Sequence, residues 1–153
     1  MALPFHYLLI DDSPHDQLLA QEAFDHLCPE CVLTCVSTGR EALDLLARQR
    51  FEPDVVLLDV NMPGMNGFEV LETLKKDPRL SRIPVVMLST SRSKGDVRKA
   101  YTLHASSYLV KSASFEEFVR QIDNFLKYWQ AVEFDHRELR DNPPQSQERK
   151  NTD

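Results

Sequence analysis

Short runs of Val, Leu and Ile recur along the chain, separated by longer segments with helical spacing. Each run is hydrophobic throughout instead of alternating with polar residues, which is typical of a strand buried on both faces of a sheet. We therefore predict five strands, at residues 7–10, 32–36, 54–58, 85–88 and 108–110.

The segments between these runs carry hydrophobic residues three and four positions apart, as amphipathic helices do. This spacing is found in residues 20–27, 42–46, 68–74 and 97–101. Three helix starts also carry capping residues, namely Ser13 before Pro14, Thr38 with Glu41, and Ser114 with Glu117. The alternation of strands and helices predicts an α/β fold, in which a doubly wound five-stranded parallel sheet has helices on both faces.

The residues that follow the last helical segment have a different composition. From about Asp135 onward they are mostly charged and polar, and they include Pro143 and Pro144. We predict a single domain over residues 1–134 and a disordered tail over residues 135–153.

Charge and hydropathy argue against two classes of partner. The formal charge of −6 disfavours a nucleic-acid surface, because binding a polyphosphate requires a basic patch. The first hydrophobic run is short and ends in two aspartates, unlike a signal peptide, and no run approaches the length that spans a membrane. We therefore expect a cytoplasmic protein that binds neither nucleic acid nor membranes.

Three cysteines, Cys28, Cys31 and Cys35, lie close together around the second run. Their spacing would suit a metal site, an iron–sulfur cluster or redox chemistry. However, Cys31 and Cys35 alternate with Leu33 along the predicted strand, whereas ligands of one metal usually lie on turns that can converge. We expect buried or half-buried reduced thiols, with a metal or redox role as the alternative.

Polar residues stand at the carboxyl ends of four of the five runs. These residues are Asp11, Asp12, Asp59, Ser89 and Lys111. In an open parallel sheet such ends lie along one edge, where ligands bind. Three carboxylates that meet there would repel one another, and Mg²⁺, which prefers oxygen ligands, would remove the repulsion. Carboxylates, a cation and a lysine suit phosphoryl transfer, in which a carboxylate can be the nucleophile.

Four segments, in this order, resemble motifs of the response regulator receiver family: LLIDD at 8–12, VLLDVNMPGMNG at 56–67, VMLST at 86–90 and YLVK at 108–111. The resemblance extends from about Tyr7 to Trp129. It implies a flavodoxin-like (βα)5 fold with strand order 2-1-3-4-5. It also implies a single-domain response regulator of a two-component phosphorelay, which is not an enzyme beyond its own phosphorylation and slow dephosphorylation.

Carried over residue by residue, the resemblance implies that Asp59 accepts a phosphoryl group from a histidine kinase. Mg²⁺ would be bound directly by Asp12 and Asp59, through water by Asp11, and by the backbone carbonyl of Asn61. Lys111 would pair with the phosphoryl oxygens.

The resemblance also implies how the signal leaves the site. Ser89 would move toward the phosphoryl group and Tyr108 would change rotamer with it. A face formed by residues 96–103, 107–110 and 114–132 would then present a changed surface to an unknown downstream protein.

The chain departs from the family at Ser112, where the family usually has a proline that follows a cis peptide bond. A cis bond before serine would cost on the order of 3 kcal/mol. Either packing of the loop offsets this cost, or the bond is trans and Lys111 is aimed differently.

Three further segments resemble the phytochrome-associated subgroup of single-domain regulators: DPRL at 77–80, STS at 89–91 and the pair Tyr128 and Trp129. This likeness implies a phytochrome-type histidine kinase and, because such regulators are often dimers, a homodimer. The last helical segment repeats large hydrophobic residues from Phe115 to Trp129. The simpler interpretation is a face packed on the sheet. The hypothesis is that its end pairs with a second copy.

Two alternatives remain. A haloacid-dehalogenase-type phosphatase also forms an aspartyl phosphate, but it needs an acidic general acid two residues later, where this chain has Asn61. The second alternative is an interaction module that keeps the receiver fold and works without phosphorylation, for which Ser112 is the main support.

Overall fold

The computed structural model describes residues 5–48, 50–111, 114 and 116–128 of the 153-residue chain. Five parallel strands form one sheet in the order β2-β1-β3-β4-β5, which confirms the predicted topology. In chain order the elements are β1 (His6–Ile10), α1 (Pro14–Leu27), β2 (Val32–Val36), α2 (Gly39–Leu46), β3 (Val55–Asp59), α3 (Gly67–Lys76), β4 (Val85–Ser89), α4 (Lys94–Thr102) and β5 (Ser107–Val110). A last helix covers residues 116–128.

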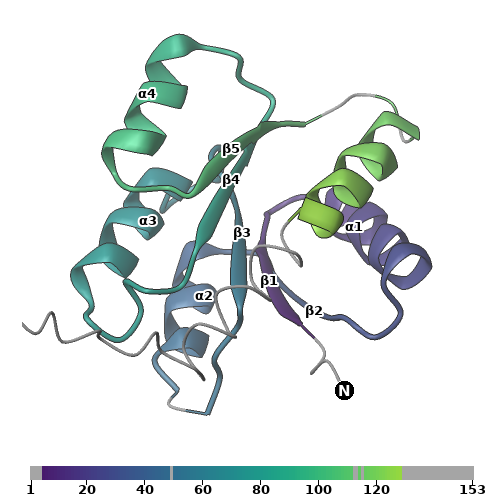
Figure 1. Ribbon diagram of the computed structural model, residues 1–153. Coiled ribbons are helices and arrows are strands. Elements are labelled where there is room, and N and C mark those ends of the chain that lie inside the picture. The colour runs from purple at the N-terminus through teal and green to yellow at the C-terminus, as the bar shows by residue number, and fades with distance from the viewer. Residues whose placement is uncertain (1–4, 49, 112–113, 115, 129–153) are drawn as a thin grey trace, which may run out of the picture.

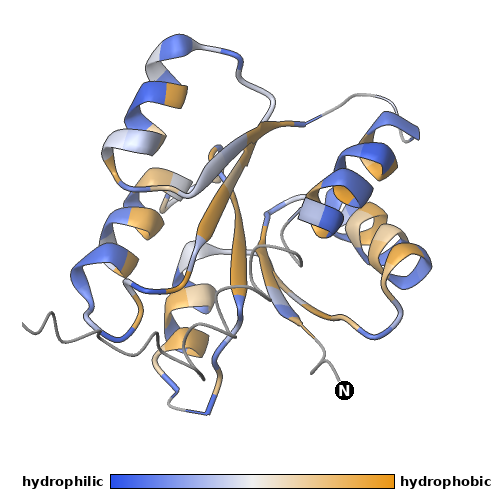
Figure 2. Ribbon diagram, viewed as in Figure 1, coloured by the Kyte–Doolittle hydropathy of each residue, from blue (hydrophilic) through white to orange (hydrophobic). Residues whose placement is uncertain are grey.

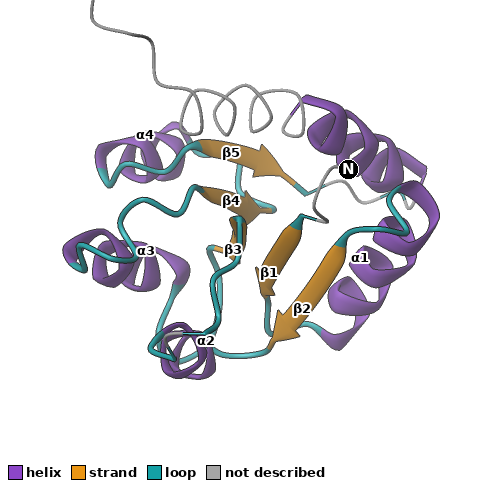
Figure 3. Cartoon of the chain, turned by 60° about the horizontal axis from the view of Figure 1, so that its bottom comes forward, coloured by secondary structure: helices purple, strands orange, loops and turns teal. Residues whose placement is uncertain are grey.

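Helices cover both faces of the sheet. α2, α3 and α4 lie against one face, and α1 and the last helix lie against the other (Figures 1 and 3). β1 shows how the strand divides its side chains, since Leu8 and Ile10 enter the core under α2 and α3, whereas Tyr7 and Leu9 enter the core under α1. The central strands are accordingly hydrophobic along most of their length (Figure 2).

Two strand features differ in detail from the sequence prediction. β4 ends one residue later than predicted and β3 is shifted one residue later, so that Asp59 and Ser89 are the last residues of their strands. The outer strands β2 and β5 are only partly buried, with Val32 48% exposed. An edge strand has a neighbour on one side only, so hydrophobic composition alone overestimated its burial.

The capping residues are placed as predicted. Ser13 Oγ accepts a hydrogen bond from the Asp16 N–H at 3.2 Å, and Thr38 Oγ1 accepts one from the Glu41 N–H at 3.0 Å. The Ser114 hydroxyl accepts a hydrogen bond from the Glu117 N–H at 3.4 Å. Each cap satisfies a donor that would otherwise have no partner in the first helical turn.

The turn between β3 and α3 requires two glycines. Gly64 has a φ of +74°, a conformation that residues with a Cβ rarely adopt. Gly67 begins α3 directly against the end of β3, where an added Cβ would lie 2.2 Å from the Asp59 carbonyl oxygen and 2.9 Å from the Val60 Cα. The first turn of α3 can therefore approach the strand end only because residue 67 has no side chain.

The prediction of reduced thiols is wrong for two of the three cysteines. Cys28 and Cys31 form a disulfide, with their Cα atoms 5.4 Å apart. The prediction failed because it extended the strand pattern to Cys31, although β2 begins at Val32, as predicted. Cys31 belongs to the preceding turn, in which its N–H donates to the Cys28 carbonyl at 3.0 Å. Cys35, inside β2, is the free cysteine and is half-buried.

Thiol counting tests this disulfide. We expect one reactive thiol per chain when the protein is unfolded without a reductant, and three after reduction, because all three cysteines of the sequence are then free. The measurement is a colorimetric thiol titration in denaturant. Cys35→Ser is the control and should leave no thiol before reduction; three thiols in the unreduced wild type would contradict the disulfide.

Several predictions concern residues outside the described part of the chain. They are the peptide bond before Ser112, the contacts of Phe115 and Trp129, and the tail at 135–153. Within the described residues, no helix combines the length and hydropathy needed to cross a bilayer.

Candidate functional site

Three carboxylates gather at the carboxyl ends of β1 and β3. One oxygen from each of Asp11, Asp12 and Asp59 lies within 4.8 Å of the others. β1 and β3 are neighbours in the sheet, with Ile10 paired to Leu58, so the residues that follow this pair must lie side by side. Asp11 and Asp59 are buried and Asp12 is half-buried. The structure thus brings together the acidic residues that the sequence singled out.

Asp11 is fixed by its surroundings. One carboxylate oxygen accepts a hydrogen bond from the Ser13 N–H at 3.0 Å, and the other contacts Lys111 Nζ at 2.7 Å. Its backbone carbonyl accepts from the Gln17 side-chain amide at 2.6 Å, and its N–H donates to the Val36 carbonyl at 3.1 Å. Asp11 therefore has little freedom to move when the site changes.

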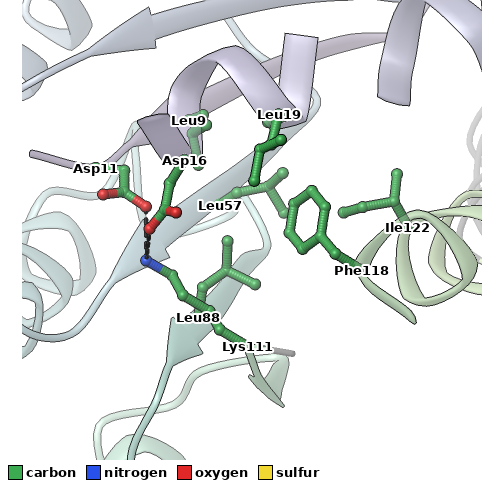
Figure 4. A pocket seen from close by; sticks show the side chains of 10 residues that line it. Leu9, Asp11, Asp16, Leu19, Leu57, Leu88, Lys111, Phe118 and Ile122 are labelled. Carbon is green, nitrogen blue, oxygen red and sulfur yellow. Dashed lines mark hydrogen bonds and ion pairs between the residues drawn. The ribbon is translucent and has the colours of Figure 1, made fainter. Parts of the chain in front are cut away.

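Lys111 opposes the carboxylates from the end of β5. Its N–H donates to the Ser89 carbonyl at 2.7 Å, which holds the backbone against β4. Its Nζ lies 2.7 Å from Asp11 and 2.9 Å from Asp16 (Figure 4). The same atom lies 3.4 Å from Asp59. Burial disfavours the ammonium ion, but hydrogen bonds and attraction to these carboxylates outweigh it and raise the pKa of Lys111. Lys111 is thus positively charged under all ordinary conditions.

Asp59 has a raised pKa. Burial disfavours its ionised form and is the main cause, the attraction of Lys111 acts in the opposite direction, and repulsion from Asp11 adds to the effect of burial. Together these shift the pKa from its ordinary value of 3.8 to about 6. Asp59 is therefore mostly ionised at neutral pH, but its ionisation costs the folded state free energy.

The two predicted switch residues converge on the loop after β4. Ser89 is fully buried, and its Oγ accepts hydrogen bonds from the Ser91 N–H at 3.0 Å and from the Asn61 side-chain amide at 3.5 Å. The Tyr108 hydroxyl donates to the Ser91 carbonyl at 3.0 Å. Both side chains are therefore hydrogen-bonded to the backbone of Ser91, so a movement of either one would affect this loop.

Sequence reasoning missed one charged member of this arrangement. Asp16, in the first turn of α1, contacts Lys111 although the two are 95 residues apart in the chain. The sequence pattern around Asp16 concerns only the helix itself, because Asp16 is the acidic residue three positions after the capping Ser13. That position predicts a helix start and says nothing about Lys111.

The donor set fits a hard divalent cation. The Asp11, Asp12 and Asp59 oxygens are carboxylates, which are the ligands that Mg²⁺ prefers, and the single neighbouring lysine leaves their charge incompletely balanced. No soft ligand lies in this group of described residues. The same three residues would therefore hold the ion.

Comparison with known proteins decides the family. Residues 7–123 match the response regulator receiver domain, and this match includes the five strands, apart from His6 at the start of β1, and the acidic cluster. The chain belongs to the response regulator receiver family. Its members are two-component signalling proteins, so this receiver domain has the general role of a response regulator.

Individual receiver proteins resemble the chain over most of their own length. The probable methanogenesis regulatory protein FilR2 of Methanothrix harundinacea is 39% identical over 130 residues, covering 82% of this chain and 84% of FilR2. The response regulator Rcp1 of Synechocystis is 35% identical over 127 residues, covering 80% of this chain and 86% of Rcp1. The Mn²⁺-bound form of Rcp1 superposes with a TM-score of 0.76 and 34% identity, covering 82% of this chain and 94% of the Rcp1 structure.

A phosphorylated structure is also similar. The phosphorylated cyanobacterial phytochrome response regulator RcpA has a TM-score of 0.79 and 34% identity, covering 84% of this chain and 96% of RcpA. Together with Rcp1, it agrees with the predicted likeness to the phytochrome-associated single-domain subgroup.

Proposed function

We propose that this receiver domain accepts a phosphoryl group on Asp59 from the phosphohistidine of a histidine kinase, in a reaction that requires Mg²⁺. The observation that carries the proposal is the position of the Asp59 carboxylate, at a strand end between two further carboxylates and Lys111. The Mn²⁺-bound Rcp1 and the phosphorylated RcpA support it, because both chains share this fold at 34% identity.

The chemistry follows from the groups present. An Asp59 carboxylate oxygen attacks phosphorus, the new P–O bond forms, the P–N bond to the donor histidine breaks, and the histidine nitrogen keeps the electron pair. Bound Mg²⁺ would supply positive charge that offsets the carboxylates and the incoming phosphoryl oxygens. Asp11, Asp12 and Asp59 would hold the ion, with the backbone carbonyl of Asn61 as the expected further ligand.

Lys111 contributes positive charge from the protein itself. It remains protonated because three carboxylates surround it, and its Nζ lies 3.4 Å from an Asp59 oxygen. It is therefore positioned to donate to a phosphoryl oxygen on Asp59. A charged donor in a buried site stabilises developing negative charge without first having to reorganise.

Phosphorylation would be reported through Ser89 and Tyr108. A phosphoryl group adds negative charge and acceptor oxygens, and the Ser89 hydroxyl would move toward it and exchange its present hydrogen bonds. Tyr108 would then leave the Ser91 carbonyl. The population would shift toward a changed surface on α4, β5 and the last helix, where a downstream protein would bind.

The partners and setting are part of the same proposal. The likeness to the phytochrome response regulator RcpA supports a phytochrome-type histidine kinase as the donor. The transfer would take place in the cytoplasm. The end of the last helix would form a homodimer contact, and Tyr128 there is 67% exposed. Light scattering at high concentration, with and without a phosphoryl mimic, tests the dimer, and a monomer in both conditions would exclude it.

Intact-mass spectrometry tests the proposed function. After incubation with acetyl phosphate and Mg²⁺, the wild type should gain one phosphoryl group, because the Asp59 carboxylate is the nucleophile. Asp59→Asn should gain none, since an amide cannot attack in this way. The matched control is Asp25→Asn, an exposed residue of α1, which should be modified like the wild type. An unmodified wild type would favour the phosphorylation-independent module.

A further inference from the structure

Asp16 contacts the lysine of the site without belonging to the acidic cluster. Its Oδ2 lies 2.9 Å from Lys111 Nζ, close to the 2.7 Å of the Asp11 contact (Figure 4). Both distances are shorter than the 3.4 Å from Lys111 Nζ to Asp59. The lysine in this conformation is therefore held more closely by Asp11 and Asp16 than by the phosphoacceptor. The contacts of Lys111 with Asp11 and with Asp16 are also hydrogen bonds, in which the Nζ is the donor.

Two of the N–H donors of Lys111 are engaged in hydrogen bonds, with Asp11 and with Asp16. A lysine ammonium has three N–H donors and no acceptor. In the structure three carboxylates lie around it, those of Asp11, Asp16 and Asp59. A phosphoryl group on Asp59 brings several acceptor oxygens. Lys111 can give more than one donor to that group only by releasing Asp11 or Asp16.

The backbone of α1 holds Asp16 in place. Its N–H donates to the Ser13 Oγ at 3.2 Å, so the residue is fixed in the first turn of the helix. Its side chain is 34% exposed, whereas that of Asp11 is 1% exposed. Water can therefore replace Lys111 at Asp16 at low cost, but it cannot do so at Asp11. Of the two contacts, the one with Asp16 is the one that phosphorylation can exchange.

We propose that Asp16 is a positioning residue that holds Lys111 away from the phosphoryl group and so slows phosphorylation of Asp59, an inference that rests on the proposed function. A carboxylate that binds Lys111 in the resting state must be displaced before the lysine can serve the phosphoryl oxygens fully. Whatever free energy that contact contributes is added to the barrier for the reaction.

The main test is the rate of phosphoryl adduct formation with acetyl phosphate at a fixed Mg²⁺ concentration, followed by intact mass. Asp16→Asn should react about fivefold faster, the size expected from loss of a partly exposed ion pair. Asp16→Glu keeps the charge and should restore a rate near that of the wild type. Asp25→Asn makes the same chemical change on the same helix, away from Lys111, and should leave the rate unchanged.

A second comparison asks whether Asp16 acts through Lys111. In a Lys111→Met background, Asp16→Asn should no longer accelerate the reaction, since there is no lysine to release. A purely structural role, or a general charge effect, would persist in that background. Asparagine keeps the backbone N–H that donates to Ser13, so Asp16→Asn should fold, and thermal unfolding without Mg²⁺ checks this.

The outcomes separate this inference from the function on which it rests. A wild type that forms no adduct refutes the proposed function and the inference together. A wild type that forms the adduct while Asp16→Asn reacts at the same rate or more slowly refutes the inference alone. Equal acceleration by Asp16→Asn with and without Lys111 also refutes it. Acceleration that depends on Lys111 and is reversed by glutamate supports it.

Discussion

Gly67→Ala is expected to destabilise the protein by about 3 kcal/mol, because the new methyl group would overlap backbone atoms. Its Cβ would lie 2.2 Å from the Asp59 carbonyl oxygen and 3.0 Å from the Asp59 carbonyl carbon. Backbone atoms cannot move aside by a change of rotamer, so the end of β3 or the start of α3 must shift. The shift would displace Asp59 itself, and we expect the rate of phosphoryl adduct formation to fall as well.

Denaturant unfolding measures the loss, and Gly95→Ala is the matched control. Gly95 also lies in the first turn of a helix, but the nearest atom to an added Cβ there is the Ser93 Oγ at 3.4 Å. Alanine at that position should change stability by less than about 1 kcal/mol and in the favourable direction. If the two variants lost stability equally, the close approach of α3 to β3 would not be what requires glycine at position 67.

Asp59→Asn is expected to stabilise the metal-free protein by about 3 kcal/mol near neutral pH. The folded-state pKa of Asp59 is raised from 3.8 to about 6, and each unit corresponds to about 1.4 kcal/mol. Because the pKa of this acid is raised, its stabilising contribution is complete below about pH 4 and is lost as the pH rises through about 6. Asparagine has no proton to lose and avoids this cost.

The measurement is the free energy of unfolding across this pH range in the presence of a chelator. The advantage of the variant should be small at the acidic end and reach its full size above the raised pKa. Added Mg²⁺ should then stabilise the wild type more than the variant, since in the proposed site the ion would bind the folded state through the Asp59 carboxylate. Asp25→Asn, at an exposed position of α1, is the control for the chemical change from carboxylate to amide. A difference that did not vary with pH would contradict the burial of an ionised Asp59.

Much of the fold could be predicted because its central strands leave a simple pattern. β3 and β4 are buried at every position, which explains their unbroken hydrophobic runs. The strand order is a different matter, since periodicity does not record which strands are neighbours, and it came from the family resemblance. The meeting of Asp11, Asp12 and Asp59 was predictable once the strands were known to be parallel, because their carboxyl ends share one edge.

What could not be predicted depends on single-residue boundaries and on distant contacts. Cys31 lies one residue before β2, in a turn that brings it to Cys28, and not in the strand, where it would alternate with Cys35. Element boundaries are the part of a sequence pattern that is least well defined. The contact of Asp16 with Lys111 joins the first helix to the last strand, and no spacing in the sequence relates two such residues.

The backbone bond between Lys111 and Ser89 affects how substitutions in the site combine. The Lys111 N–H donates to the Ser89 carbonyl at 2.7 Å. The residues that bear the ammonium and the hydroxyl are therefore hydrogen-bonded neighbours where β4 and β5 pair. A substitution that shifts the end of β4 therefore displaces both groups together. The effects of substitutions at positions 89 and 111 should then be non-additive. The free-energy change measured for one substitution would depend on whether the other residue is intact.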